Sequence, residues 1–213
     1  MLDSNAFTVY LFTAFLLAIT PGPGIFYVAA RTLSGGRSEG IASSLGNGFG
    51  GLFHVVAGGL GVSAIVLASA ELFTALKVVG ALYLVWMGYR TIRHARLDYK
   101  SLAHSEPPVG TMRAFRDGVL VEVMNPKTAA FFLAFIPQFV DTASDHVVLQ
   151  FLALGAISVA LNTLADIVVA FAAGRLRDGA ASRANLVRRL REGSGGAMIM
   201  LGCGLLLAKR PVV

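Results

Sequence analysis

The sequence predicts an all-α integral membrane protein with about six transmembrane helices, and three observations lead to that prediction. Hydrophobic residues make up 55% of the 213 residues and charged residues only 14%, whereas soluble domains carry about 25% charge. The mean hydropathy is +0.70, so a soluble fold would expose one continuous apolar surface. The apolar residues also fall into runs of about 20 residues, the length of helix that spans ~30 Å of hydrocarbon.

The first three spans are predicted at residues 4–30, 40–70 and 72–89. The first span has no charged residue, and the second is interrupted only by Asn47 and His54. Glycines recur along the second span at a spacing that allows close helix packing and permits a homodimer. These glycines are Gly46, Gly50, Gly58, Gly59 and Gly61.

The last three spans are predicted at residues 118–140, 147–174 and 193–208. The fourth and fifth contain charged residues inside the apolar run, which is costly in lipid unless the charges are paired or face water. The sixth is the shortest, and basic residues follow it directly, from where their side chains reach the headgroups. A protein of five spans with a cytoplasmic C-terminus is the alternative.

Basic and acidic linkers alternate along the chain. Arginine and lysine gather in residues 31–39, 91–117 and 175–192, whereas the linkers at 71 and 141–146 are acidic. Because positive loops stay in the cytoplasm, the basic linkers are predicted to be cytoplasmic and both termini to lie outside. The net charge of +6 therefore has a topological meaning, and no nucleic-acid partner is expected.

The whole chain, residues 1–213, is predicted to form one transmembrane transporter domain made of two halves. Repeat one covers about residues 1–92, a cytoplasmic linker about 93–113, and repeat two about 114–213. Since each half has an odd number of spans, the second half enters the membrane in the opposite direction to the first. Inverted repeats of this kind, with broken helices near a central site, are typical of secondary transporters.

The first span is expected to break at Pro21, Gly22, Pro23 and Gly24. A proline inside a helix removes a backbone donor and clashes with the carbonyl four residues before it. In lipid, the freed backbone groups need partners in protein or in a water-filled cavity. The helix that restarts here carries partial positive charge at its N-terminus, which suits a substrate carboxylate. The alternative is a kink that serves packing alone.

The fourth span is expected to break in the same way at Asn125, Pro126 and Lys127. The proline starts a new helix, and the asparagine side chain offers both a donor and an acceptor. Lys127 lies several residues inside the span, where it neutralises an acid or binds a substrate carboxylate. The alternative is a structural ion pair or a side chain that extends to the headgroups.

Three further residues are candidates for coupling transport to protons: Asp166, Glu122 and His54. Asp166 lies midway along the fifth span, so it is protonated, paired or facing an aqueous path. Glu122 lies near the cytoplasmic end of the fourth span and has an interfacial position as its alternative. Histidine exchanges protons near neutral pH, although a lone histidine in a helix is more often a hydrogen-bonded packing residue.

No enzyme, cofactor or metal site is expected from the sequence. The chain has no GxxxxGK[ST] phosphate loop, no HExxH and no GxSxG, the motifs expected of an ATP motor, a metalloprotease or a lipase. Its one cysteine, Cys203, cannot form a redox pair or a cysteine-rich metal site. A membrane redox relay, which needs two intramembrane cysteines, is therefore nearly excluded.

Several of these segments together resemble the LysE/RhtB family of amino-acid exporters, over essentially the whole chain. The segments are Thr20-Pro21-Gly22-Pro23, Gly80-Ala81-Leu82-Tyr83-Leu84 with Gly88, Asn125-Pro126-Lys127 with Phe131-Phe132, and Pro137-Gln138-Phe139. The resemblance implies about six spans in the bacterial inner membrane and proton-driven efflux of small amino acids or their derivatives. It also implies a polar residue in the second span, near the position of His54.

The resulting hypothesis is a proton-coupled exporter of amino acids. The substrate carboxylate would bind near Gly22–Gly24 and Lys127, and its ammonium group near Asp166 or Glu122. Two alternatives remain open, a cation exporter of the wider superfamily and a membrane protein that transports nothing. Metal export would require clustered Cys, His or carboxylate ligands, and the buried charges argue against a purely structural role.

Overall fold

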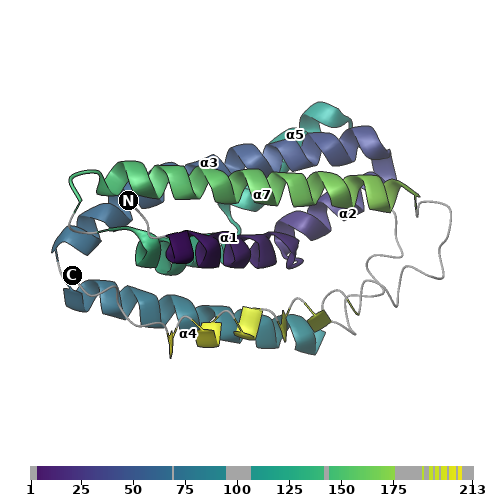
Figure 1. Ribbon diagram of the computed structural model, residues 1–213. Helices are drawn as coiled ribbons and strands as arrows, with labels where there is room; N and C mark the ends of the chain where they lie inside the picture. The colour runs from purple at the N-terminus through teal and green to yellow at the C-terminus, as the bar shows by residue number, and fades with distance from the viewer. Residues whose placement is uncertain are drawn as a thin grey trace.

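The computed structural model describes four continuous stretches and several short pieces near the C-terminus. The stretches are residues 4–68, 70–94, 107–141 and 144–175, and the pieces are 189, 192–193, 195–196, 198–200, 202–204 and 206–207. Within this part of the chain all regular secondary structure is helical (Figure 1). The predicted fold class, an all-α membrane protein, is confirmed.

Four α-helices lie among the described residues of the first half of the chain. They are α1 (Ser4–Ile19), α2 (Pro23–Gly35), α3 (Arg37–Ala68) and α4 (Ala70–His94). The first two are bent by 43° relative to each other, so the predicted break of the first span is confirmed. Pro23 stands at the start of α2, where its missing N–H costs nothing, and Gly22 precedes it in an extended conformation.

The second half begins with another broken pair. Its elements are α5 (Thr111–Val123), α6 (Pro126–Ala130), a π-helix η1 (Phe131–Phe135), a 3₁₀-helix η2 (Ile136–Phe139) and α7 (Val147–Arg175). The segments before and after Pro126 are bent by 41°, which confirms the second predicted break. The α-helix also loses its regular winding before Pro137, which lacks the N–H of an α-helical turn. The side chain of Gln138 donates to the carbonyl of Ala134 there, at 2.7 Å.

Among the described residues, α7 alone is long and apolar enough to cross a membrane as a single straight helix. The pairs α1–α2 and α5–η2 each pass the same test when both parts are taken together. The length and composition of each broken pair therefore fit either one bent span or one re-entrant segment.

The helices run side by side and, when each broken pair is taken as one segment, successive segments alternate in direction (Figure 1). The α2–α3 junction, the end of α4, the start of α5 and the end of α7 lie at one end of the molecule. The start of α1, the α3–α4 junction and the start of α7 lie at the opposite end. The described parts of the basic linkers thus lie together at one end of the molecule, and the acidic linkers lie together at the other. The predicted topology, in which basic and acidic linkers alternate along the chain, requires this separation. The symmetry between the two halves stays a prediction.

Helix α3 lies at the centre of the packing and contacts α2, α5 and α7. Its glycines allow the close approach, because a Cβ at Gly46 would collide with the carbonyl oxygen of Phe115 on α5. A Cβ at Gly50 would lie 2.6 Å from the carbonyl oxygen of Val119. Gly58 faces α7, where a Cβ would lie 2.6 Å from the ring of Phe151. The predicted role of these glycines in helix packing is confirmed at these positions.

The predicted sixth span falls partly outside the described residues. Its described residues are helical, and some of them pack against α4. Met198 is buried together with Ala81 and Leu84 of α4, and Gly195 faces the backbone of Gly88. Most of the basic residues predicted in the two longer cytoplasmic linkers, and those that follow the sixth span, also lie outside the described residues.

Replacing Gly46 with alanine is expected to destabilise the protein by about 1–3 kcal/mol, because the added methyl group overlaps backbone atoms of α5. Gly61 of the same helix provides a matched control, since no atom lies within 4 Å of a Cβ placed there. Gly61→Ala should be neutral or slightly stabilising. Denaturant unfolding in detergent micelles measures both, and equal midpoints for the two variants would contradict the packing.

Candidate functional site

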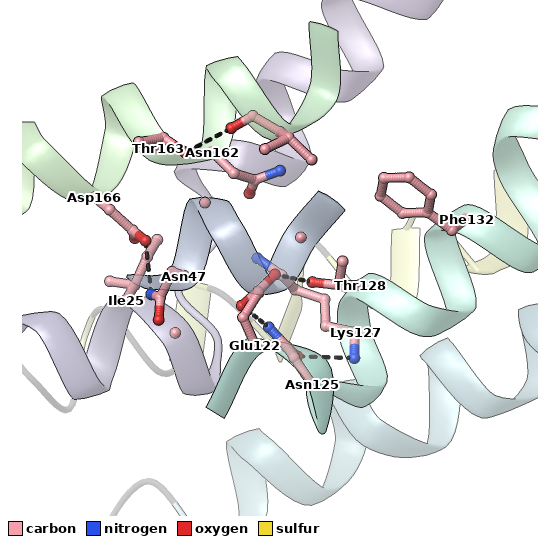
Figure 2. A pocket seen from close by; sticks show the side chains of 14 residues that line it. Ile25, Asn47, Glu122, Asn125, Lys127, Thr128, Phe132, Asn162, Thr163 and Asp166 are labelled. Atoms are coloured by element: carbon pink, nitrogen blue, oxygen red, sulfur yellow. Dashed lines mark hydrogen bonds between the residues drawn. The ribbon is translucent and has the colours of Figure 1, made fainter. Parts of the chain in front are cut away.

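The two helix breaks lie next to a cavity that is also lined by α3 and α7 (Figure 2). The lining residues are Gly24, Ile25, Asn47, Gly48, Gly51, Glu122, Asn125, Lys127, Thr128, Phe132, Val159, Asn162, Thr163 and Asp166. The cavity volume is about 20 Å³, which is room for about one water molecule. In this structure the cavity therefore has no room for an amino acid.

Lys127 joins the second break to the first. Its ammonium group donates to the carbonyl oxygens of Leu17 at 3.1 Å and Thr20 at 2.8 Å, at the C-terminal end of α1. The last carbonyls of a helix have no partners within it and carry partial negative charge, so a cation is stabilising there. Gly22 leaves room for the lysine chain, because a Cβ at Gly22 would lie 3.1 Å from its Cδ.

Glu122 lies between the starts of the two restarted helices. Its Oε2 accepts a hydrogen bond from the Asn125 amide at 2.8 Å, and its Oε1 accepts one from the Thr128 hydroxyl at 2.6 Å. A Cβ added at Gly24, in the first turn of α2, would lie 2.8 Å from Oε2. The carboxylate of the protein itself thus lies where the sequence predicted a substrate carboxylate.

Asn125 holds two of these groups in place with one side chain. Its Oδ1 accepts a hydrogen bond from the backbone N–H of Lys127 at 3.0 Å, which caps the start of α6. Its Nδ2 donates to Glu122. Because the cap and the carboxylate share the amide, a change in one of them disturbs the other.

Asp166 enters the cavity from α7 and is 5% exposed. Its Oδ2 accepts a hydrogen bond of 2.7 Å from the Asn47 amide on α3. The other amide atom, Asn47 Oδ1, is buried and has no hydrogen-bond partner among the described residues. This oxygen lies toward α5, where a Cβ at Gly118 would be 3.3 Å from it.

His54 lies behind the cavity and does not line it. Its ring nitrogen Nε2 is 2.9 Å from the backbone carbonyl oxygen of Glu122, to which it can only donate. The ring also faces Phe132, with 5.9 Å between the ring centroids. His54 therefore contacts the site through the backbone of α5.

The structure brings five predicted residues to one cavity: Gly24, Glu122, Asn125, Lys127 and Asp166. The other predicted residues of the breaks shape the chain around the cavity without lining it; these are Pro21, Gly22, Pro23 and Pro126. Thr128, Asn162 and Thr163 line the cavity and were not singled out from the sequence. Asn162 and Thr163 stand about one turn before Asp166, so helical spacing was the signal that could have found them.

The charges in the cavity favour a cationic partner. Two carboxylates, Glu122 and Asp166, and one ammonium group, Lys127, line it, so the three groups carry one net negative charge when all are ionised. A buried net charge is costly unless it is compensated. A proton or a substrate ammonium group compensates it. Within the described residues, no cluster of three or more His, Cys, Asp or Glu side chains forms a metal site.

Comparisons with known proteins find similar sequences along most of the chain. The sequence profile of the family described as LysE type translocator matches residues 15–209. An uncharacterized membrane protein of Vibrio cholerae serotype O1 is 32% identical over 97% of this chain and 98% of its own length. A homoserine/homoserine lactone efflux protein of Salmonella typhimurium is 30% identical over 72% of this chain and 73% of its own. A leucine efflux protein of an Enterobacter species is 26% identical over 70% of each chain. No solved structure matches.

Replacing Lys127 with methionine is expected to destabilise the protein by about 2–3 kcal/mol, because two buried carbonyls lose a charged donor. Arg113→Met is the control, since its ion pair with Asp117 is exposed and such pairs contribute about 1 kcal/mol or less. The measurement is the denaturation midpoint of each purified variant. A Lys127→Met protein as stable as the Arg113→Met protein would show that the end of α1 does not need the lysine.

Proposed function

Because this chain belongs to the family of LysE type translocators, we propose that it is a secondary transporter that exports amino acids or close derivatives by proton antiport. The observation that carries the proposal is the pair of buried carboxylates, Glu122 and Asp166, at a cavity between two broken helices. Ionisable residues inside a membrane typically mark substrate paths and proton relays.

The names of the relatives indicate which chemical group such a site recognises. Homoserine, homoserine lactone and leucine, named for the relatives from Salmonella typhimurium and Enterobacter, all carry an amino group. The lactone has no free carboxylate, because its carboxyl group is esterified within the ring. A carboxylate on the protein that binds the ammonium group is therefore the feature that all three molecules can use.

Asp166 is the better placed of the two carboxylates to bind that ammonium group. Both oxygens of Glu122 already accept hydrogen bonds from protein donors, whereas Asp166 accepts one from Asn47 on Oδ2. The side-chain oxygens of Asn162 and Thr163, which line the same cavity, are further acceptors. An ammonium group has three donors to share among such acceptors.

The carboxylate of an amino-acid substrate is proposed to bind near Gly24 and Lys127, at the starts of α2 and α6. In this structure the position holds Glu122. Two carboxylates cannot both be ionised at such close range without a large cost. An amino acid therefore binds there when Glu122 is protonated or has moved away, and this makes Glu122 the second coupling residue. His54, bonded to its backbone, is the third candidate.

Proton antiport follows from competition at Asp166. A substrate ammonium group and a proton each neutralise the same carboxylate, so the site holds one or the other. The loaded carrier moves substrate outward, protonation on the outside releases it, and deprotonation in the cytoplasm prepares the site again. Movement of one half of the molecule against the other provides the alternating access.

The proposed setting is the bacterial inner membrane, with the basic end of the molecule in the cytoplasm and both termini outside. Arg37, Arg93 and Arg113 stand at or near the start of α3, the end of α4 and the start of α5, which share the basic end. Glu71 and Asp145 stand near the starts of α4 and α7, at the other end. This distribution follows the rule that positive loops stay inside.

Asp166→Asn is expected to reduce pH-gradient-driven transport at least about a hundredfold, because the amide keeps the shape but cannot alternate between a charged and a neutral form. The assay uses proteoliposomes with homoserine, leucine or homoserine lactone as probes and an imposed pH gradient. Asp145→Asn, on an exposed loop, should transport like the unaltered protein. Full gradient-driven flux by Asp166→Asn, or flux by the unaltered protein that ignores the gradient, contradicts the coupling.

A further inference from the structure

A stripe of buried polar side chains runs along α3 from the basic end of the molecule to the cavity. Glu39, Ser43 and Asn47 follow one another at intervals of four residues, so they lie on one face of the helix. Their exposed fractions are 3%, 0% and 3%. The stripe is about 12 Å long at 1.5 Å per residue, and its inner end, Asn47, lines the cavity.

Glu39 fastens the outer end of this stripe to the second half of the molecule. Its Oε1 accepts hydrogen bonds from the backbone N–H groups of Val109 at 2.9 Å and Gly110 at 2.8 Å, directly before α5. Hydrogen bonds to an ionised acceptor are about twice as strong as neutral ones. Its Oε2 is buried and has no hydrogen-bond partner among the described residues.

Helix α5 covers the rest of the stripe. A Cβ at Gly118 of α5 would lie 2.7 Å from the carbonyl oxygen of Ser43 and 3.3 Å from Asn47 Oδ1. Tyr27 of α2 donates from its hydroxyl to the carbonyl oxygen of Ala114 on α5, at 3.1 Å. The buried polar groups of the stripe can thus become accessible to solvent on the side covered by α5 only after α5 moves away.

We propose that this stripe is the route by which substrate reaches the cavity from the cytoplasm, and that Glu39 is the latch that keeps it closed. The inference rests on the proposed function, because it names the inward path to the same site. An arriving ammonium group competes with the two backbone donors for the Glu39 carboxylate. Binding of substrate at the outer end of the stripe therefore releases α5 and opens the path.

A purely structural role for Glu39, as a cap on α5, would also explain its two hydrogen bonds. The two roles differ in what happens when the bonds are lost. A latch opens one side of the molecule while the other side stays closed. A lost structural cap loosens the packing on both sides of the cavity.

Two serine-to-cysteine reporters separate these outcomes, both in a Cys203→Ser background. Ser43→Cys reports on the stripe, and Ser158→Cys reports on α7 on the far side of the cavity, where Ser158 contacts the Tyr10 hydroxyl. Both serines are 0% exposed. The rate of modification by a membrane-impermeant maleimide is measured in inside-out and right-side-out vesicles, with Glu39 intact, Glu39→Gln or Glu39→Ala.

Glu39→Ala should raise the modification rate of the Ser43→Cys reporter at least about tenfold. Glu39→Gln, which keeps a neutral acceptor, should raise it less. The Ser158→Cys reporter should react no faster in either variant. Asp117→Asn is the matched control, because it removes a negative charge from the same end of the molecule. Asp117 is partly exposed and pairs with Arg113. This variant should change neither modification rate.

An unchanged rate at the Ser43→Cys reporter in both Glu39 variants would overturn the proposal. A comparable rise at both reporters would also overturn it, because that is the result of a lost structural cap. The modification assay needs no substrate. An unaltered protein that transports no amino acid would therefore refute the proposed function, while the reporter rates would still decide whether Glu39 closes the stripe.

Discussion

The hydrogen bonds from Lys127 to the end of α1 are the interaction on which the site depends. Two helices break inside the apolar part of the molecule, and each break leaves backbone groups that lipid cannot satisfy. The ammonium group of Lys127 serves the last carbonyls of α1, and the carboxylate of Glu122 lies at the start of α2. Both charged side chains belong to the second broken pair and contact the first, so they hold the two breaks side by side.

This arrangement places charged side chains in the buried interior of a membrane protein, where they are costly. These charges determine what the cavity can bind. Lys127 compensates one of the two carboxylates, and Asp166 on α7 brings the second. The remaining negative charge has two natural partners, a proton and a substrate ammonium group. A carrier that exchanges these two needs a site that holds either of them but not both, and a single uncompensated carboxylate meets that need.

Much of this organisation could be predicted from the sequence, because it follows from local rules. Prolines predicted both helix breaks, together with glycines at the first, and glycine spacing predicted the face of α3 that packs against α5 and α7. The partners of the charged groups could not be predicted. Lys127 bonds to carbonyls 107 and 110 positions away, and nothing local encodes that contact. Glu39 was assigned to a linker because it precedes the apolar run, whereas α3 begins at Arg37 and buries it. No sequence pattern predicted the π-helix at Phe131–Phe135 either.

Proton release on substrate binding tests the competition at Asp166 most directly. Purified protein in a weakly buffered solution with a pH indicator is brought to a pH at which the empty site is protonated, and homoserine, leucine or homoserine lactone is then added. Binding should release up to about one proton per molecule of the unaltered protein, and Asp166→Asn should release none. Binding without proton release in the unaltered protein, or equal release in the Asp166→Asn variant, would contradict a shared site for proton and substrate.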